Sequence, residues 1–175
     1  MIDLIIDTIW LFLPAGIANM SPVIFKWLPI FNYPVDCNKT FNNKRIFGDH
    51  KTYRGLFVGV LMAILTVYIE KQFINNNSLI DYNEINVAFL GFLLGFGALG
   101  GDLLKSFFKR QFNVQPGVSW MPFDQIDWIL GALLAISLYQ CVNWRVWVIS
   151  LSLGLILHIL INIIGYYLGI KKNRL

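Results

Sequence analysis

The sequence predicts an all-α integral membrane protein with five transmembrane helices. Hydrophobic residues make up 57% of the 175 residues and the mean hydropathy is +0.60, which is too apolar for an ordinary soluble domain. Charge-free runs also recur, and most approach the roughly 17 to 25 residues that a spanning helix needs. These runs are Thr8–Phe25, Gly55–Ile69, Ile85–Gly101, Trp128–Trp144 and Val146–Ile170. We therefore expect one membrane-embedded domain over residues 1–175, with helices at about 4–26, 54–74, 85–108, 124–141 and 145–170.

The first two helices need separate arguments. Asp3 and Asp7 precede the first apolar run where a cleavable signal would carry basic residues, so we expect this helix to be retained. The second run is short. Arg54 and Lys71 flank it, and both can bury their stems while their charged groups reach the membrane interface.

The third helix is rich in glycine, and the last two are bounded by polar residues. Small residues spaced four apart usually let membrane helices approach closely, so packing is the first interpretation of these glycines. They are Gly91, Gly95, Gly97, Gly100 and Gly101. The fourth helix is expected to start near Asp124, after Pro122, and the fifth to end before Lys171.

Basic residues predict the orientation. They gather in the loops after the first and third helices, expected at about 30–53 and 109–123, and in the carboxyl-terminal tail, whereas the opposite side holds only Lys71 and Arg145. By the positive-inside rule, both loops and the carboxyl terminus are cytoplasmic and the amino terminus is outside. The net charge of +4 follows from this topology, so no nucleic-acid partner is expected.

Three carboxylates are expected to meet at the cytoplasmic edge of the membrane. Asp102, Ser106 and Lys109 share one face if the third helix continues past Gly101. Asp124 and Asp127 share a face near the start of the fourth helix. Hard oxygen ligands of this kind suit Mg²⁺, which completes its coordination with phosphates and water. An alternative for Asp124 and Asp127 is that they cap the helix.

The first cytoplasmic loop supplies basic groups for a polyphosphate. In "GDHKTYRG", Lys51, Thr52 and Arg54 lie between glycines, although the spacing is not that of a P-loop. The alternative is a basic loop that only obeys the positive-inside rule. Asn19, at the inner end of the first helix, is a further candidate substrate contact.

Six segments in order resemble landmarks of a known family. They are "PAGIAN", "PVD", "GDHKTYRG", "GDLLKSFFKR", "DQID" and "LGIKK". "GDLLKSFFKR" followed by "FDQID" resembles the signature of CDP-diacylglycerol synthases, and the whole set is closer to their short relatives, the CDP-archaeol synthases. Gln125 stands where the long enzymes have arginine.

The resemblance implies a CTP-dependent cytidylyltransferase that transfers CMP to a membrane lipid phosphate, of the archaetidic or phosphatidic acid type. It implies that Asp102 and Asp124 hold Mg²⁺ with help from Asp127, and that Lys109 and Arg110 contact phosphates. It also implies that Lys51, Thr52 and Arg54 bind the nucleotide. Further residues that we expect to bind substrate are Asn19, Lys44, Arg45, Ser106 and Gln125.

Such a transfer needs no catalytic histidine, because a lipid phosphate is already largely dianionic at neutral pH. The active site would lie on the cytoplasmic side, where CTP meets the lipid head group. The small-residue helix faces leave a homodimer open. A small transporter or scaffold without catalytic activity is the alternative function. It is disfavoured by the absence of a sequence repeat and by charges that gather at one interface.

Overall fold

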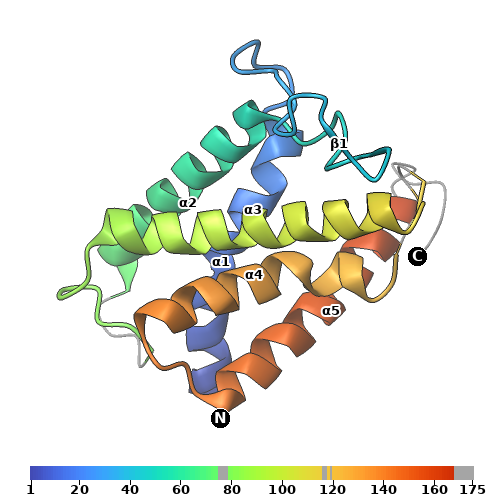
Figure 1. Cartoon of the computed structure of the whole chain (residues 1–175). Helices are drawn as coiled ribbons and strands as arrows, with labels where there is room; N and C mark the ends of the chain where they lie inside the picture. The colour runs from blue at the N-terminus through green and yellow to red at the C-terminus, as the bar shows by residue number, and fades with distance from the viewer. Residues whose placement is uncertain (75–78, 116–117, 119, 168–175) are drawn as a thin grey trace.

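The computed structural model describes residues 1–74, 79–115, 118 and 120–167, and within them the chain forms five helices (Figure 1). The helices are α1 (Ile2–Ile24), α2 (Tyr53–Phe73), α3 (Val87–Gln111), α4 (Phe123–Tyr139) and α5 (Trp144–Tyr167). The predicted helical class is therefore confirmed. Where the structure describes them, the helix ends differ from the predicted ones by no more than three residues. The predicted end of the fifth helix, at 168–170, lies outside the described residues.

Side-chain caps set the starts of two helices. The Thr52 side chain accepts a hydrogen bond of 3.2 Å from the Gly55 backbone N–H at the start of α2. The Asn86 side chain accepts one of 3.1 Å from the Phe89 N–H at the start of α3. These bonds satisfy backbone donors that have no partner inside the helix, which fixes where each helix begins.

α3 lies at the centre of the bundle, packed against α1, α2 and α4, and α5 packs on α4 and α1. The glycines of α3 lie at its contacts, as predicted. A Cβ on Gly91 would meet the backbone of Ile64 in α2, and one on Gly95 would lie 2.7 Å from the Ala63 Cβ. Gly100 is the exception, with open space around its Cβ position. Close helix approach therefore explains most of this glycine-rich stretch.

The segment between α1 and α2 folds back over the end of α3. It contains the short antiparallel hairpin of β1 (Thr40–Phe41) and β2 (Lys44–Arg45), and an isolated bridge joins Pro34 to Thr52. β2 contacts α3. The hairpin lies beside the carboxyl-terminal end of α3 (Figure 1), where the Lys44 side chain of β2 donates a hydrogen bond to the Gln111 carbonyl.

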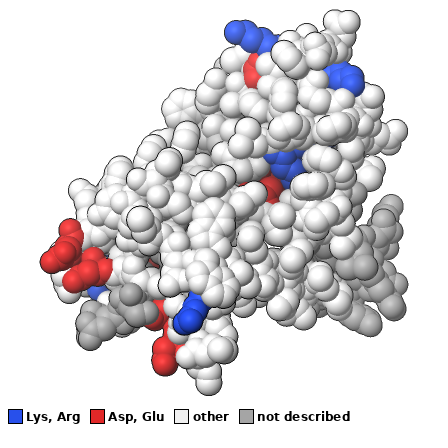
Figure 2. Space-filling model, turned by 60° about the horizontal axis from the view of Figure 1, so that its bottom comes forward, with Lys and Arg blue, Asp and Glu red and all other residues white. Residues whose placement is uncertain are grey.

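Three helices, α1, α2 and α3, are long and apolar enough to cross a membrane. Many large apolar side chains on the helices point outward, among them Leu65, Phe96 and Leu138. Figure 2 shows a face that is largely uncharged, with charged side chains at its margins and a small charged group recessed in a hollow. The five spans and their orientation stay predictions.

Candidate active site

Three lysines and three aspartates form one ion-pair network where the ends of α3, α4 and the first loop meet. Lys105 lies at its centre. Its Nζ is 3.2 Å from Asp102 Oδ1, 3.2 Å from Asp124 Oδ1 and 2.6 Å from Asp127 Oδ2. Lys51 pairs with Asp102 from the loop side, and Lys109 Nζ lies 2.8 Å from Asp124 Oδ1. The structure thus brings together the three carboxylates that the sequence predicted to converge.

Glycines allow this convergence. A Cβ on Gly101 of α3 would overlap the backbone carbonyl of Asp127, and one on Gly131 of α4 would overlap that of Gly97. Because neither helix has a side chain at these contacts, α4 can lie directly against α3. The "DQID" turn is therefore held beside Asp102.

Lys105 is the central residue of the network, and sequence reasoning did not predict it as a site residue. Its spacing of three residues from Asp102 indicates only a local helix pair. The two further acids reach it from α4, through a tertiary contact that spacing along α3 does not reveal. Only 15% of the Lys105 side chain is exposed, so its charge is neutralised by these acids rather than by water.

Asp124 does not cap α4, which corrects the capping alternative. α4 begins at Phe123, its N-cap position is Pro122, and no side chain caps it. Asp124 lies within the first turn, where Oδ2 accepts hydrogen bonds of 2.6 Å from the Trp120 N–H and 2.9 Å from Lys109 Nζ. Lys109 also donates to the Val118 carbonyl at 2.9 Å. This acid therefore ties the second loop to α3.

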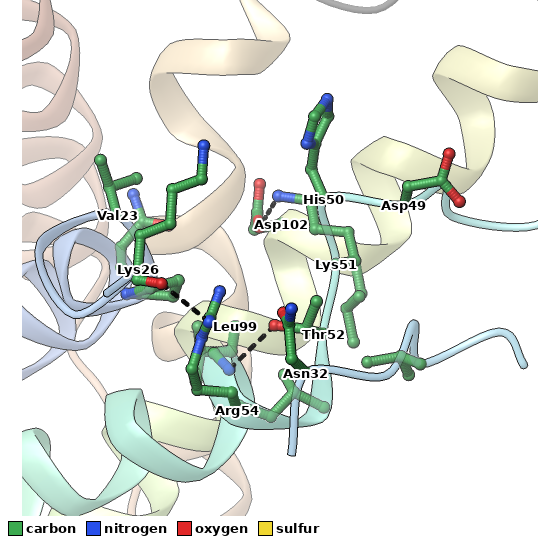
Figure 3. A pocket seen from close by; sticks show the side chains of 16 residues that line it. Val23, Lys26, Asn32, Asp49, His50, Lys51, Thr52, Arg54, Leu99 and Asp102 are labelled. Atoms are coloured by element: carbon green, nitrogen blue, oxygen red, sulfur yellow. Dashed lines mark hydrogen bonds and ion pairs between the residues drawn. The ribbon is translucent and has the colours of Figure 1, made fainter. Parts of the chain in front are cut away.

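A polar pocket of about 450 Å³ opens beside the network (Figure 3). Asp102 and Lys51 form an ion pair in its wall, so the network and the pocket share these two residues. Five of the predicted site residues line it: Asn19, Lys51, Thr52, Arg54 and Asp102. Lys26, Asn32 and His50 line it as well and were not predicted as site residues. The lining thus holds three cationic side chains, those of Lys26, Lys51 and Arg54, and two acids, Asp49 and Asp102, and the excess of positive charge suits an anionic ligand.

Two pocket residues also have structural roles. Arg54 is 7% exposed and donates from Nη1 to the carbonyls of Lys26 and Leu28, at 2.8 and 2.9 Å. These bonds fix the chain just after α1. Thr52 is the N-cap of α2. Both residues therefore hold the pocket wall in shape, whatever they contact in a ligand.

Asp36 organises the first loop and was not predicted as a site residue. Its buried carboxylate accepts hydrogen bonds from Arg45 and from three backbone N–H groups, those of Asn38, Phe47 and Gly48. Burial by itself raises the pKa of Asp36, but these donors outweigh it and hold the pKa well below its ordinary value. The charged carboxylate therefore fixes the segment that leads into "GDHKT".

The other predicted substrate-binding residues, Lys44, Arg45, Ser106 and Gln125, do not line the pocket. Arg45 pairs with Asp36 and Asp49, at 2.8 Å in both cases. Lys44 Nζ donates to the Gln111 carbonyl at 2.6 Å, and Ser106 Oγ donates to the Asp102 carbonyl at 2.8 Å. Arg110 Nε and Gln125 Oε1 are among the buried polar atoms that have no hydrogen-bond partner in the described part of the chain.

In the part of the chain that the structure describes, no group of three or more His, Cys, Asp or Glu side chains is arranged to hold a metal ion directly. The three carboxylates converge on the Lys105 ammonium instead. Asp124 Oδ1 and both Asp127 oxygens are nevertheless buried without a hydrogen bond of good geometry. Carboxylate oxygens are ligands that a hard cation prefers, but a lysine ammonium lies 2.8 Å from Asp124 Oδ1 and 2.6 Å from Asp127 Oδ2, so a metal ion would have to displace these lysines.

Comparisons with known proteins identify the family. A family model described as CarS-like, CDP-archaeol synthase, matches residues 1–174. Relatives named CDP-archaeol synthase include one from Archaeoglobus fulgidus, 39% identical over 98% of both chains. Another, from Methanococcus vannielii, is 40% identical over 98% of this chain and 97% of its own. This chain belongs to the CDP-archaeol synthase family.

A solved structure agrees with this assignment. It is described as an intramembrane enzyme for archaeal membrane lipid biosynthesis, and it superposes with a TM-score of 0.76. The two chains are 31% identical, and the match covers 91% of this chain and 94% of that one. As a CDP-archaeol synthase family member, the protein is an integral membrane enzyme of lipid biosynthesis and a cytidylyltransferase.

Proposed function

We propose that the protein transfers CMP from CTP to an archaetidic acid-type lipid phosphate, giving CDP-archaeol or its unsaturated form and releasing pyrophosphate. The observation that carries the proposal is the polar pocket, which shares Asp102 and Lys51 with the adjoining network of acids and lysines. The pocket suits a nucleotide polyphosphate, and the network suits the charge that moves during the transfer. The family name supports the choice of an archaeol lipid over phosphatidic acid.

The transfer exchanges one phosphorus–oxygen bond for another. An oxygen of the lipid phosphate bonds to the α-phosphorus of CTP while the bond from that phosphorus to the α,β-bridging oxygen breaks. Pyrophosphate leaves with the electron pair. The attacking phosphate, with a second pKa of about 6, is mostly dianionic at neutral pH and has no proton to lose. The barrier is therefore repulsion between anions, and the enzyme lowers it with fixed positive charge.

The lysines of the network are suited to this task. Lys51 borders the pocket directly, whereas Lys105 and Lys109 lie on the far side of Asp102. All three are paired with carboxylates, so their ammonium groups are held in place before substrate arrives. Preorganised charges stabilise a transition state more than mobile ones do, because no reorganisation is needed during the reaction.

The proposal assigns a magnesium ion to these acids. Asp102, Asp124 and Asp127 would hold it in exchange for their lysine partners, since Asp124 Oδ1 and both Asp127 oxygens are buried without a hydrogen bond of good geometry. When bound, Mg²⁺ neutralises negative charge on the phosphates. It would also take over the neutralisation of these carboxylates, which leaves the Lys105 ammonium available to phosphate oxygens. The pocket would lie at the cytoplasmic face, where CTP is present.

The test is transfer of label from α-³²P-CTP into an organic phase by purified protein with Mg²⁺. An archaeal-type ether lipid phosphate and phosphatidic acid are supplied in separate reactions. We expect label in the ether lipid. Loss of label with EDTA and its return with excess Mg²⁺ would support the metal.

Asp102→Asn is the variant to compare, with Asp3→Asn as the matched control. Asp102→Asn removes one charge at the pocket and should lower transfer by about 100-fold or more, the scale seen when one electrostatic group is removed from an active site. Asp3→Asn, in the first turn of α1, should leave transfer unchanged. Absence of transfer to either lipid by the unaltered protein would overturn the proposal in favour of a transporter or scaffold.

A further inference from the structure

A second cavity, of about 340 Å³, lies between α1, α4 and α5. Its floor is buried: Phe12 is 4% exposed and Ile129 is 3% exposed. Its rim is open, because Leu13 and Leu157 line it and are 38% and 46% exposed. The cavity is therefore a groove along the side of the bundle that opens outward.

The groove is apolar in effect, although two hydroxyl groups lie in its wall. Thr8 Oγ1 donates to the Leu4 carbonyl at 2.6 Å, and Ser150 Oγ donates to the Val146 carbonyl at 2.7 Å. Both hydroxyls are satisfied by their own helices, so neither needs a polar ligand. The other wall residues are almost all apolar, and the aromatic rings of Phe12 and Trp128 are among them.

Asn19 joins the groove to the polar pocket, because it lines both cavities. From Asn19 the groove follows α1 to Thr8. At a rise of 1.5 Å per residue this stretch is about 16 Å long. Half of a bilayer's hydrocarbon core is about 15 Å. The groove thus runs from the pocket over the depth of one leaflet.

We propose that this groove binds one hydrocarbon chain of the lipid phosphate, with the head group at Asn19 and the chain end near Thr8. The inference rests on the proposed function, since it assigns the lipid part of that substrate. A molecule lying this way places its phosphate at the wall shared with the nucleotide pocket and its chain parallel to neighbouring lipid chains.

The dimensions of the groove favour a hydrocarbon chain as its occupant over a helix from a second copy of the protein. Spread over its length, the volume gives a cross-section of about 20 Å², whereas a helix with side chains is about 10 to 12 Å across. Gly16 faces the Trp128 ring, and a Cβ there would lie 3.6 Å from it. A larger side chain at this position, or at the adjacent rim residue Leu13, would therefore narrow the groove.

The test compares two substitutions of the same kind. Leu13→Trp fills the groove, and Leu65→Trp places the same side chain on the outer face of α2 at a similar exposure, 44%. KM is measured for CTP and for lipid phosphates with long and short chains, each in ether and ester form. We expect Leu13→Trp to raise KM for long-chain lipid about ten-fold, as if contact with roughly two methylene groups were lost. KM for CTP and for short-chain lipid should stay within about two-fold, and Leu65→Trp should resemble the unaltered protein.

Photo-cross-linking gives a second readout that does not depend on turnover. The unaltered protein is irradiated with a lipid phosphate that carries a diazirine midway along one chain, and the adducts are mapped by mass spectrometry. Adducts on groove residues such as Leu13, Ile17 or Leu153 support the inference. Adducts confined to α2, or equal KM changes in both tryptophan variants, overturn it while leaving the proposed reaction intact. Failure of the unaltered protein to transfer label from CTP would instead count against the reaction, and the adducts would still report on the groove.

Discussion

The bundle buries carboxyl groups at both ends, but it gives them different partners. At one end, Asp102, Asp124 and Asp127 pair with lysines from two segments of the chain, the first loop and α3. Toward the other end of α2, Glu70 is 3% exposed and its described partner is the Tyr82 hydroxyl, which donates to Oε2 at 3.5 Å. In the described ranges no lysine or arginine forms an ion pair with Glu70, and its Oε1 has no hydrogen-bond partner.

The difference separates a functional cluster from a structural one. An acid paired with an ammonium group can exchange that partner for a metal ion, and the ammonium can then bind phosphate. An acid that contacts only a phenol has no such exchange available. Burial, and next the nearby Glu70, raise the pKa of Tyr82 above its ordinary value, so this phenol stays protonated and remains a donor. We therefore expect substitutions at the lysine-paired end to be costly and those at Glu70 to be mild.

The largest loss of stability should come from Lys105→Met. Lys105 is the cation within ion-pair distance of Asp127, so its removal leaves a buried charge without compensation. Breaking a buried pair in this way typically costs about 3 to 5 kcal/mol. The measurement is thermal unfolding of the purified protein in detergent, and the variant should unfold at a clearly lower temperature.

Asp127→Asn in the Lys105→Met background is the control, and it should recover much of the lost stability because the uncompensated charge is gone. Mg²⁺ adds a second comparison. A ligand that binds only the folded state raises its stability by mass action. If the carboxylates hold the metal, Mg²⁺ should raise the unfolding temperature of Lys105→Met more than that of the unaltered protein. Equal responses would count against these acids as a metal site.

A moderate loss of stability is expected from Asp36→Asn. Asp36 is an acid held by fixed donors, and it therefore adds a third case to the comparison of the two ends. Asn keeps the size of Asp36 but loses the charge that Arg45 and three backbone N–H groups recognise. Hydrogen bonds to charged groups contribute about 1.5 to 3 kcal/mol each, so we expect a loss of about 2 kcal/mol after rearrangement. Faster amide exchange at Phe47 and Gly48 would report it. Asp49→Asn, at an Arg45 partner that is 76% exposed, should change little.

The stability lost in Asp36→Asn should depend on pH. The folded state lowers the pKa of Asp36, so its charge stabilises the fold fully above the ordinary carboxyl value of about 3.9. That contribution is lost as the pH falls below this value. The stability difference between the unaltered protein and Asp36→Asn should therefore be constant from about pH 5 to 7 and shrink toward pH 2. A difference that grows on acidification would contradict the assignment.

Local patterns in the sequence predicted the helices and the convergence of the acids. The site residues that these patterns did not predict depend on contacts between distant segments. Asp102 and the "DQID" acids were predictable because each lies at the end of an apolar run, where helix ends meet. Lys105 was missed because its role depends on two acids from α4. Asp36 was missed because its donors lie up to twelve residues away in an irregular loop.

The residues of the pocket were also only partly predictable from local sequence patterns. Lys51, Thr52 and Arg54 were predicted from one short segment, but Lys26 and Asn32 reach the pocket only because the chain after α1 folds back. Arg54 holds that fold through the carbonyls of Lys26 and Leu28, a role that no spacing indicated. The glycines of α3 were predicted to pack, but not that Gly101 and Gly131 would bring Asp127 beside Lys105.

The smallest effect should come from Glu70→Gln. The amide keeps the shape of the side chain and an oxygen that can accept from the Tyr82 hydroxyl, and it breaks no ion pair among the described residues. We expect a change in stability of about 1 kcal/mol or less, the scale of a single neutral hydrogen bond. Cytidylyl transfer should stay within about two-fold, because α2 carries Glu70 about 24 Å along the helix from Arg54. A large drop in unfolding temperature would mean that Glu70 is ionised and paired, and the contrast between the two ends would then fail. A small change, beside a large one for Lys105→Met, would establish that burial alone does not make an acid critical in this bundle and that its lysine partners do.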